Sequence, residues 1–134
     1  MKRILIAVLL AGSAAAATAT PRQLIQSYAE AALRHAPGYQ PSARRGAELY
    51  GRRFGVSEKM PACASCHSDS PARAGRHVVT GKAIKPLAPR VEAARFTDRA
   101  KTEKWFRRNC TEVLGRECSA AEKADFILFL TEAQ

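Results

Sequence analysis

The stretch Cys63-Ala64-Ser65-Cys66-His67 decides how the rest of this 134-residue chain is interpreted. It has the pattern C-x-x-C-H, the attachment signal of a c-type haem. Two thiols at this spacing can reach both vinyl groups of one porphyrin and form thioethers, and the next histidine is then held under the iron. The pattern therefore predicts one covalent haem c, with Cys63 and Cys66 as attachment residues and His67 as the proximal iron ligand.

Two other kinds of site use a Cys-x-x-Cys pair. A dithiol redox site requires a thioredoxin-like βαβ context, and no strand-helix-strand pattern surrounds the pair. A zinc site requires a second, closely spaced Cys or His pair, whereas Cys110 and Cys118 lie far downstream and eight positions apart. Both alternatives are weaker than haem attachment.

The N-terminus has the features of a secretory signal. Lys2 and Arg3 precede an apolar, alanine-rich stretch, and Ala17-Thr18-Ala19 fits the small-x-small cleavage rule. The stretch is short of the ~20 strongly apolar residues that a membrane span needs. We expect residues 1–19 to be a signal peptide cleaved near Ala19, and the mature protein to be exported and not transmembrane.

The charge of the chain is strongly basic. The whole sequence carries a formal net charge of +10, and without Lys2 and Arg3 there remain 20 basic against 12 acidic residues, a charge of +8. Basic proteins often bind nucleic acid, but an exported haem protein meets none. The charge favours an acidic electron-transfer partner or an anionic membrane surface, with a generally basic, solvated surface as the plain alternative.

The four cysteines divide into two pairs. If haem takes Cys63 and Cys66, then Cys110 and Cys118 remain in an oxidising compartment, where leftover pairs become disulfides. Closing so short a loop stabilises a fold by about 2.5 kcal/mol in the chain-entropy model.

The rest of the chain is typical of an all-α protein. We predict a helical extension over 20–40 with a helix from Pro21 to His35, and a haem domain over 41–134. In that domain a helix capped by Ser42 carries Gly46 and Tyr50 on one face. Residues 68–95 read as a long loop around the haem edge. A helix from Thr97 to about Cys110, with Trp105 and Phe106 on its apolar side, precedes a last helix that Ser119 and Glu122 begin with a capping box.

The second iron ligand is not obvious from the sequence. Electron-transfer cytochromes c commonly use methionine, but Met1 leaves with the signal and Met60 is three residues before Cys63, on the proximal side. His77 would give a bis-histidine iron, although it can equally be an exposed loop residue. Lys82 and Lys85 would have to lose a proton, and a weak ligand or an open position is the remaining choice.

A family resemblance bears on this choice. The C-x-x-C-H motif is followed by segments that resemble the SHP-type monohaem cytochromes c, which are class I-like domains: HVVTGKAIKPLAP, RFTD, EKWFRRNC, LGREC and EKADFILFL. The resemblance covers roughly residues 41 to 134. In that family an asparagine directly before the first cysteine of a short disulfide is the distal ligand. The resemblance therefore implies Asn109 as the distal ligand and a Cys110–Cys118 disulfide.

The resemblance also implies a function. Asn109 would bind ferric iron and release it on reduction, so that O₂, NO or another small diatomic could bind the ferrous haem. Dihaem c-type and membrane b-type cytochromes are the implied redox partners, in the periplasm. No acid–base residue is placed to support an oxidase or reductase, so we expect electron transfer and ligand binding rather than an enzyme. The alternative is a plain low-spin bis-histidine electron carrier that uses His77.

Overall fold

The computed structural model describes residues 18–134, so most of the predicted signal peptide lies outside the described residues. Over this range the chain forms five helices and one short hairpin. They are, in order, α1 (Pro21–Leu33), α2 (Ala43–Gly51), α3 (Ala64–His67), β1 (Gly75–Arg76), β2 (Ala83–Ile84), α4 (Arg99–Leu114) and α5 (Ala120–Glu132). The all-α prediction is confirmed.

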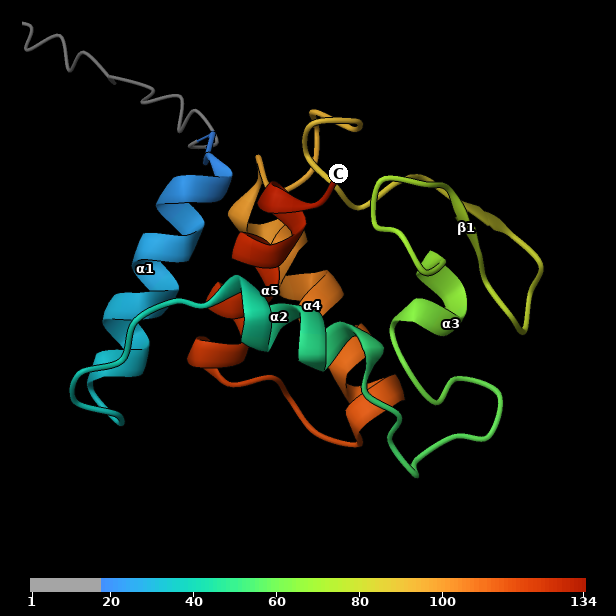
Figure 1. The fold of residues 1–134 in the computed structure, drawn as a ribbon, viewed down its shortest axis with the longest axis horizontal. Helices are drawn as coiled ribbons and strands as arrows, with labels where there is room; N and C mark the ends of the chain where they lie inside the picture. Colours follow the sequence, from blue (N-terminus) through green and yellow to red (C-terminus); the bar gives the residue numbers. More distant parts are fainter. Residues whose placement is uncertain (1–17) are drawn as a thin grey trace, which may run out of the picture.

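Helix α5 is the central element of the fold. It packs against both α1 and α2, and Figure 1 shows it between them and in front of α4. Its inward positions Ala124, Ile127 and Leu130 are completely buried. The three predicted helix starts are confirmed, because Thr20, Ser42 and Ser119 each accept a hydrogen bond from a backbone amide of the first helical turn.

The crossing of α2 over α5 depends on Gly46. A Cβ at this position would overlap the carbonyl oxygen of Asp125 and would lie 2.7 Å from the Cβ of Phe129. Tyr50, one turn later, packs beside the crossing with ring centroids 5.5 Å from Phe129 and 6.1 Å from Phe126. The predicted contact between this helix and the last helix is confirmed.

Asp125 clamps the start of α2 to α5. Its carboxylate is almost fully buried and accepts hydrogen bonds from the Tyr39 hydroxyl at 2.6 Å, the Ser42 amide at 2.7 Å and the Arg45 Nε at 2.7 Å. A buried carboxylate is tolerated only when its oxygens are satisfied in this way. Sequence reasoning missed this clamp, because Tyr39 and Asp125 lie 86 positions apart.

A second polar cluster joins α1, α4 and α5. Glu103 accepts a hydrogen bond from the Tyr28 hydroxyl at 2.7 Å and pairs with Lys123 at 2.8 Å. The chain before α1 also contacts the start of α4, since Thr18 bridges to Asp98 and the Ala19 amide donates to the Thr97 carbonyl at 2.8 Å. Helix α1 is therefore part of the same core as the haem domain, and the boundaries at residues 19 and 40 stay predictions.

Helix α4 differs from the prediction at both ends. Its N-cap is Asp98, whose side chain accepts from the Lys101 amide at 2.9 Å, and not Thr97, whose hydroxyl instead donates to the Ala94 carbonyl. The helix also continues past Cys110 to Leu114, where Gly115 ends it in the left-handed conformation at φ 72°. Cys110 and Cys118 form a disulfide with a Cα–Cα distance of 5.6 Å, which ties the last turns of α4 to the start of α5.

The predicted loop over 68–95 contains the β1–β2 hairpin. The two strands pair antiparallel, Gly75 with Ile84 and Arg76 with Ala83. Strands of two residues are too short to show an alternating pattern, which is why the sequence did not predict them. None of the helices within residues 18–134 combines the length and the apolar character that crossing a membrane requires.

Candidate haem site

The C-x-x-C-H motif forms a single helical turn. Amides of Cys66 and His67 donate to the Cys63 carbonyl at 3.2 and 3.1 Å, so the motif is already folded into α3. Cys63 and Cys66 are free thiols and partly exposed, whereas Cys110 and Cys118 are bonded to each other. Two free thiols on one turn, followed by a histidine, fit the attachment of haem c. The bonded pair cannot complete a zinc site with them.

Two contacts fix the position of α3. The Tyr50 hydroxyl of α2 donates to the carbonyls of His67 at 3.0 Å and Ser68 at 2.6 Å, so it caps the carbonyl end of the turn. On another side Gly75 of β1 lies so close that a Cβ there would overlap the Cys66 carbonyl and lie 2.8 Å from the Cα of His67. The turn is therefore held between α2 and the hairpin.

Burial controls the protonation of the motif. It raises the pKa of the Cys63 thiol to about 11, with a smaller effect from Cys66. Burial also lowers the pKa of His67 to about 4, helped by the positive charges of Arg95 and His77. A neutral imidazole is the form that binds a metal, so His67 is ready to act as an iron ligand at neutral pH.

A hollow opens beside the motif. It has a volume of about 640 Å³ and lies between α3 and the hairpin, lined by residues that include Cys66, Ser68, Gly75, His77 and Val78. Volumes of this size accommodate organic groups as large as a cofactor. Space is therefore present directly against one of the two thiols.

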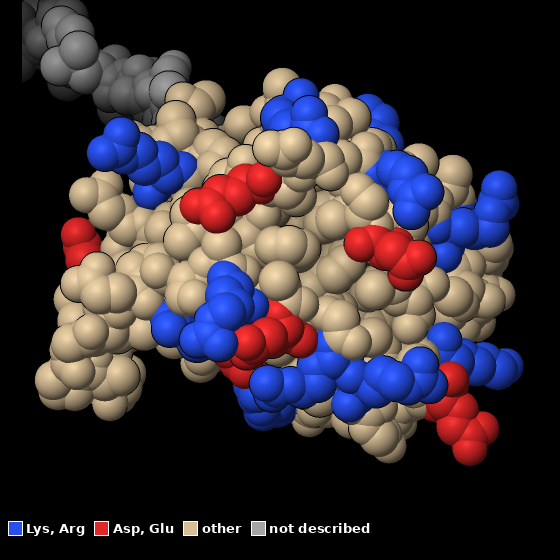
Figure 2. Space-filling view, in the orientation of Figure 1, with Lys and Arg blue, Asp and Glu red and all other residues tan. Residues whose placement is uncertain are grey.

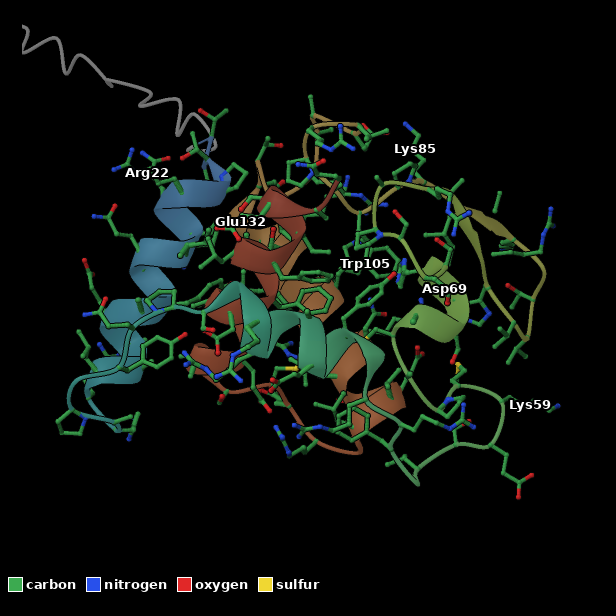
Figure 3. The ribbon with its side chains drawn as sticks, in the orientation of Figure 1. Arg22, Lys59, Asp69, Lys85, Trp105 and Glu132 are labelled. Atoms are coloured by element: carbon green, nitrogen blue, oxygen red, sulfur yellow. A yellow bond between two sulfur atoms is a disulfide. The ribbon has the colours of Figure 1, made fainter. Side chains whose placement is uncertain are left out.

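Asn109 lies on α4 and not at its end. It is partly buried and shares a helix face with Trp105, one turn earlier. Figure 3 labels Trp105 in the region between α4 and α3, and its side chain is 43% exposed, so the predicted apolar packing holds for Phe106 but not for Trp105. This face of α4 is the part of the helix that the protein core does not cover.

The Asn109 carboxamide has no hydrogen-bond partner among residues 18–134, although other polar side chains of α4 have partners. Thr102 and Thr111 donate to backbone carbonyls, Arg108 pairs with Glu112, and Glu103 joins the cluster with Tyr28 and Lys123. An amide without a protein partner is free to serve as a ligand.

The other candidates for the distal ligand lie on the hairpin or just after it. His77 follows β1, and its Nδ1 accepts from the amides of Val79 at 3.3 Å and Thr80 at 3.2 Å. Lys82 is exposed at the hairpin turn, and Lys85 pairs with Glu92 at 2.9 Å. All three come from the segment that packs against α3, next to the proximal histidine.

A haem-attachment turn that is held against two crossed helices defines the class of small c-type cytochromes. The comparisons with known proteins agree. A family model described as a domain of unknown function (DUF1924) matches residues 37–130. Cytochrome c'' of Methylophilus methylotrophus is 43% identical over 92% of this chain and 87% of its own. Cytochrome c-type protein SHP of Cereibacter sphaeroides is 41% identical over 95% of both chains.

Solved structures of these two proteins share the fold. Oxidised SHP, described as an oxygen-binding cytochrome c, aligns with a TM-score of 0.76 over 84% of this chain and 96% of its own, at 42% identity. Oxidised cytochrome c'' aligns with a TM-score of 0.79 over 85% and 94%, also at 42% identity. The chain belongs to the SHP-type monohaem cytochromes c, and its cofactor is one covalently bound haem c.

The resemblance extends further than the sequence indicated. Coverage of 84% or more of the chain cannot be reached from residues 41–134 alone, so α1 belongs to the shared structure. Sequence reasoning also missed three residues around the motif: the support from Tyr50 and Gly75, and the half-buried Arg95. Only the Gly46–Tyr50 pair gave a signal for any of them, because the other two act through contacts that are distant in sequence.

Proposed function

We propose that this chain is an exported, periplasmic cytochrome in which Cys63 and Cys66 hold the haem, and His67 and Asn109 are the axial ligands. Residues 1–19 serve as the signal peptide, 20–40 as a helical extension and 41–134 as the haem domain. The observation that carries the proposal is the unpartnered Asn109 amide on the uncovered face of α4, next to the Cys110–Cys118 bond. The bond limits how far this part of α4 can move.

The weakness of the distal ligand gives the protein its second activity. Haem c supplies one-electron chemistry and, where an axial position is free, a place for a small ligand. A neutral amide is a poor ligand compared with imidazole, so we propose that Asn109 releases the iron on reduction and that O₂, NO or a similar diatomic then binds. In support, one relative is described as oxygen-binding and the structure of another addresses haem-ligand detachment.

The proposed partners follow from the same resemblance. Dihaem c-type cytochromes and membrane b-type cytochromes would exchange electrons with the haem, and a diatomic molecule would bind at the reduced site. Electron transfer coupled to ligand binding describes this activity better than an enzymatic reaction.

Spectra of an Asn109→Ala variant test the distal ligand. The ferric variant should become five-coordinate or take up water, and should bind azide or cyanide faster, by about tenfold if the amide bond contributes about 1.4 kcal/mol. The ferrous spectra of wild type and variant should nearly coincide, because the wild-type amide has already been released. Thr111→Ala, on the opposite face of α4, is the matched control and should leave both spectra unchanged.

The second candidate function is a bis-histidine electron carrier. One observation favours it: His77 is near enough to His67 for its charge to lower the pKa of that imidazole. It requires a wild-type ferrous form that stays low-spin and becomes high-spin on replacement of His77 by alanine. That result would assign the distal site to His77 and would end the proposal for Asn109.

A further inference from the structure

Arg95, just before α4, carries a charge that forms no ion pair with an acidic side chain. Its Nε donates to the Pro86 carbonyl at 2.8 Å and its Nη2 to the Lys85 carbonyl at 2.7 Å. Glu92, the acidic residue nearest in sequence, pairs instead with Lys85 at 2.9 Å. Arg95 takes part in none of the ion pairs formed within residues 18–134.

This guanidinium is half-buried, which makes the missing partner costly. Burial lowers the pKa of Arg95, yet an arginine does not lose its proton in a protein. A cation that has been taken out of water is stabilised only by an opposite charge or by a full set of hydrogen bonds. The side chain has five N–H donors, of which the two carbonyls occupy only some. Donors therefore remain for an anion.

The position of Arg95 indicates which anion this is. Its charge is the second cause, after burial, that lowers the pKa of the His67 imidazole. The carbonyls that it binds lead into Leu87, which is buried with Tyr50 and Leu130 and has Cys63 packed against the same cluster. Figure 3 labels Lys85 on this segment, next to α3 and the hairpin. The guanidinium thus borders the region that haem must occupy.

The backbone next to Arg95 is bent to hold this arrangement. Phe96 has a positive φ of 59°, which is strained for a bulky residue. The bend lets Phe96 pack against both core clusters, while the preceding Arg95 stays bound to the two carbonyls. Strain of this kind persists only where surrounding contacts impose it.

We propose that Arg95 binds a propionate carboxylate of haem c and, through that ion pair, raises the reduction potential of the iron. Haem c has two propionates on the edge opposite its thioethers, and arginine binds carboxylates through paired N–H donors. This role rests on haem attachment at Cys63 and Cys66 with His67 as a ligand. It does not depend on which residue is the distal ligand.

The ion pair has two measurable consequences. A cation beside the carboxylate offsets its negative charge, so the reduced iron is less disfavoured than it would be next to a bare carboxylate. The same cation holds the pKa of the propionate down, and its loss should raise that pKa by about 1–3 pH units. The midpoint potential should then change with pH in a higher pH range.

The test measures midpoint potential against pH for the haem-loaded wild type and Arg95→Gln. We expect the variant to favour the ferric form about tenfold more at neutral pH, which is a potential about 59 mV lower for a one-electron couple. We expect the pH-dependent region of its curve to move upward. Arg90→Gln is the matched control: Arg90 is exposed and its Nε donates to the Ala133 carbonyl at 2.8 Å, so its potential should equal that of wild type.

Other titratable groups near Arg95 are separated by the design. Glu92 is present in every variant, and Lys85 holds its pKa below the usual value. His67 is occupied by iron in the loaded protein. His77 is the remaining one, so the same measurement is repeated with His77→Ala added to the wild type and to Arg95→Gln. The shift caused by Arg95→Gln should be the same with and without His77.

Arg95→Lys separates charge from structure. It keeps the positive charge but loses the forked hydrogen bonds to the two carbonyls, so it should retain most of the wild-type potential and pH profile even if it melts earlier. This variant also decides the outcome if Arg95→Gln fails to accumulate. Equal curves for Arg95→Gln and wild type, or a lysine variant that loses the potential as fully as glutamine does, would overturn the proposal. Failure of the proposed function is distinguishable, since wild type would then carry no haem at all.

Discussion

At the scale of single residues, the molecule combines a strong proximal ligand with a weak distal one. His67 is buried and kept neutral, and Tyr50 and Gly75 fix the turn that carries it. Asn109 has no such support, because its carboxamide finds no partner among the described residues of the chain. This difference gives the iron one permanent bond and one that depends on its oxidation state.

The Glu103 carboxylate provides a test of the pH dependence of folding. Burial alone would raise its pKa, but hydrogen bonds from Lys123 and Tyr28 outweigh burial and lower it. A carboxyl group with a lowered folded-state pKa stabilises the fold above its unfolded pKa, and this contribution is lost as pH falls through the folded value. Glu103→Gln should therefore cost about 1 kcal/mol at pH 7, a figure discounted for partial exposure.

Urea unfolding at several pH values measures this effect. The difference between wild type and Glu103→Gln should be full at pH 7 and should shrink below about pH 4.5, the ordinary pKa of a glutamate. Other carboxylates with lowered pKa values, such as Glu122, are present in both proteins and cancel. A difference that stays constant down to about pH 3 would mean that the charge of Glu103 contributes nothing.

At the scale of secondary-structure elements, the α2–α5 crossing depends on one missing side chain. Gly46→Ala would place a methyl group against the Asp125 carbonyl, which belongs to backbone and cannot move aside. We expect a loss of about 3 kcal/mol. Gly51→Ala, at the end of the same helix, meets no atom within 4 Å and should be neutral or slightly stabilising. Thermal melts of the two variants should diverge, and similar melts would show that the crossing can widen.

The disulfide between α4 and α5 should affect stability without affecting haem attachment. Cys110→Ser should lower the free energy of unfolding by roughly 2–4 kcal/mol, because the eight-residue connection is no longer closed. It should also loosen the Asn109 side of the haem. Intact mass spectrometry should still find haem on the variant. Its absence there would mean that the assignment of the four cysteines is incorrect.

Sequence patterns predicted most of the elements, and local chemistry explains which ones. Thr20, Ser42 and Ser119 act within one helical turn, so their capping role was visible in the sequence. The start of α4 was placed one residue early because Thr97 and Asp98 are both capping residues, and only the folded chain selects Asp98. Gly115 was a usable stop signal for the other end.

Long-range contacts account for what the sequence could not predict. The hairpin is held by Gly75 against the Cys66 backbone, and the Asp125 clamp joins residues from opposite ends of the haem domain. The haem motif itself was predicted fully because its chemistry is confined to five consecutive residues. The role of Arg95 could not be, since it depends on a charge partner that is not part of the polypeptide.

At the scale of the whole molecule, the basic charge should govern encounters with redox partners. The chain carries a formal net charge of +10, and Figure 2 shows a row of Lys and Arg side chains along the lower edge of the face in view. Salt shortens the range of such a field from about 30 Å at 0.01 M to about 8 Å at 0.15 M.

Stopped-flow reduction and oxidation at increasing salt test this effect. Rates with an anionic inorganic reagent should fall several-fold over this range of ionic strength, and rates with a cationic reagent should rise. A neutral reagent should be insensitive to salt and serves as the control. Equal salt dependence for the anionic and cationic reagents would show that the surface field does not steer their approach.

The exposed face of α4 also gives the protein an optical reporter. Trp105 is the only tryptophan of the chain and lies one turn from Asn109 on the same helix face. Porphyrins absorb in the region where indole emits, so energy transfer should keep the fluorescence of the folded, haem-loaded protein low. Any motion that carries α4 away from the porphyrin should brighten this emission. The position of the helix that bears Asn109 can thus be followed in real time without a label.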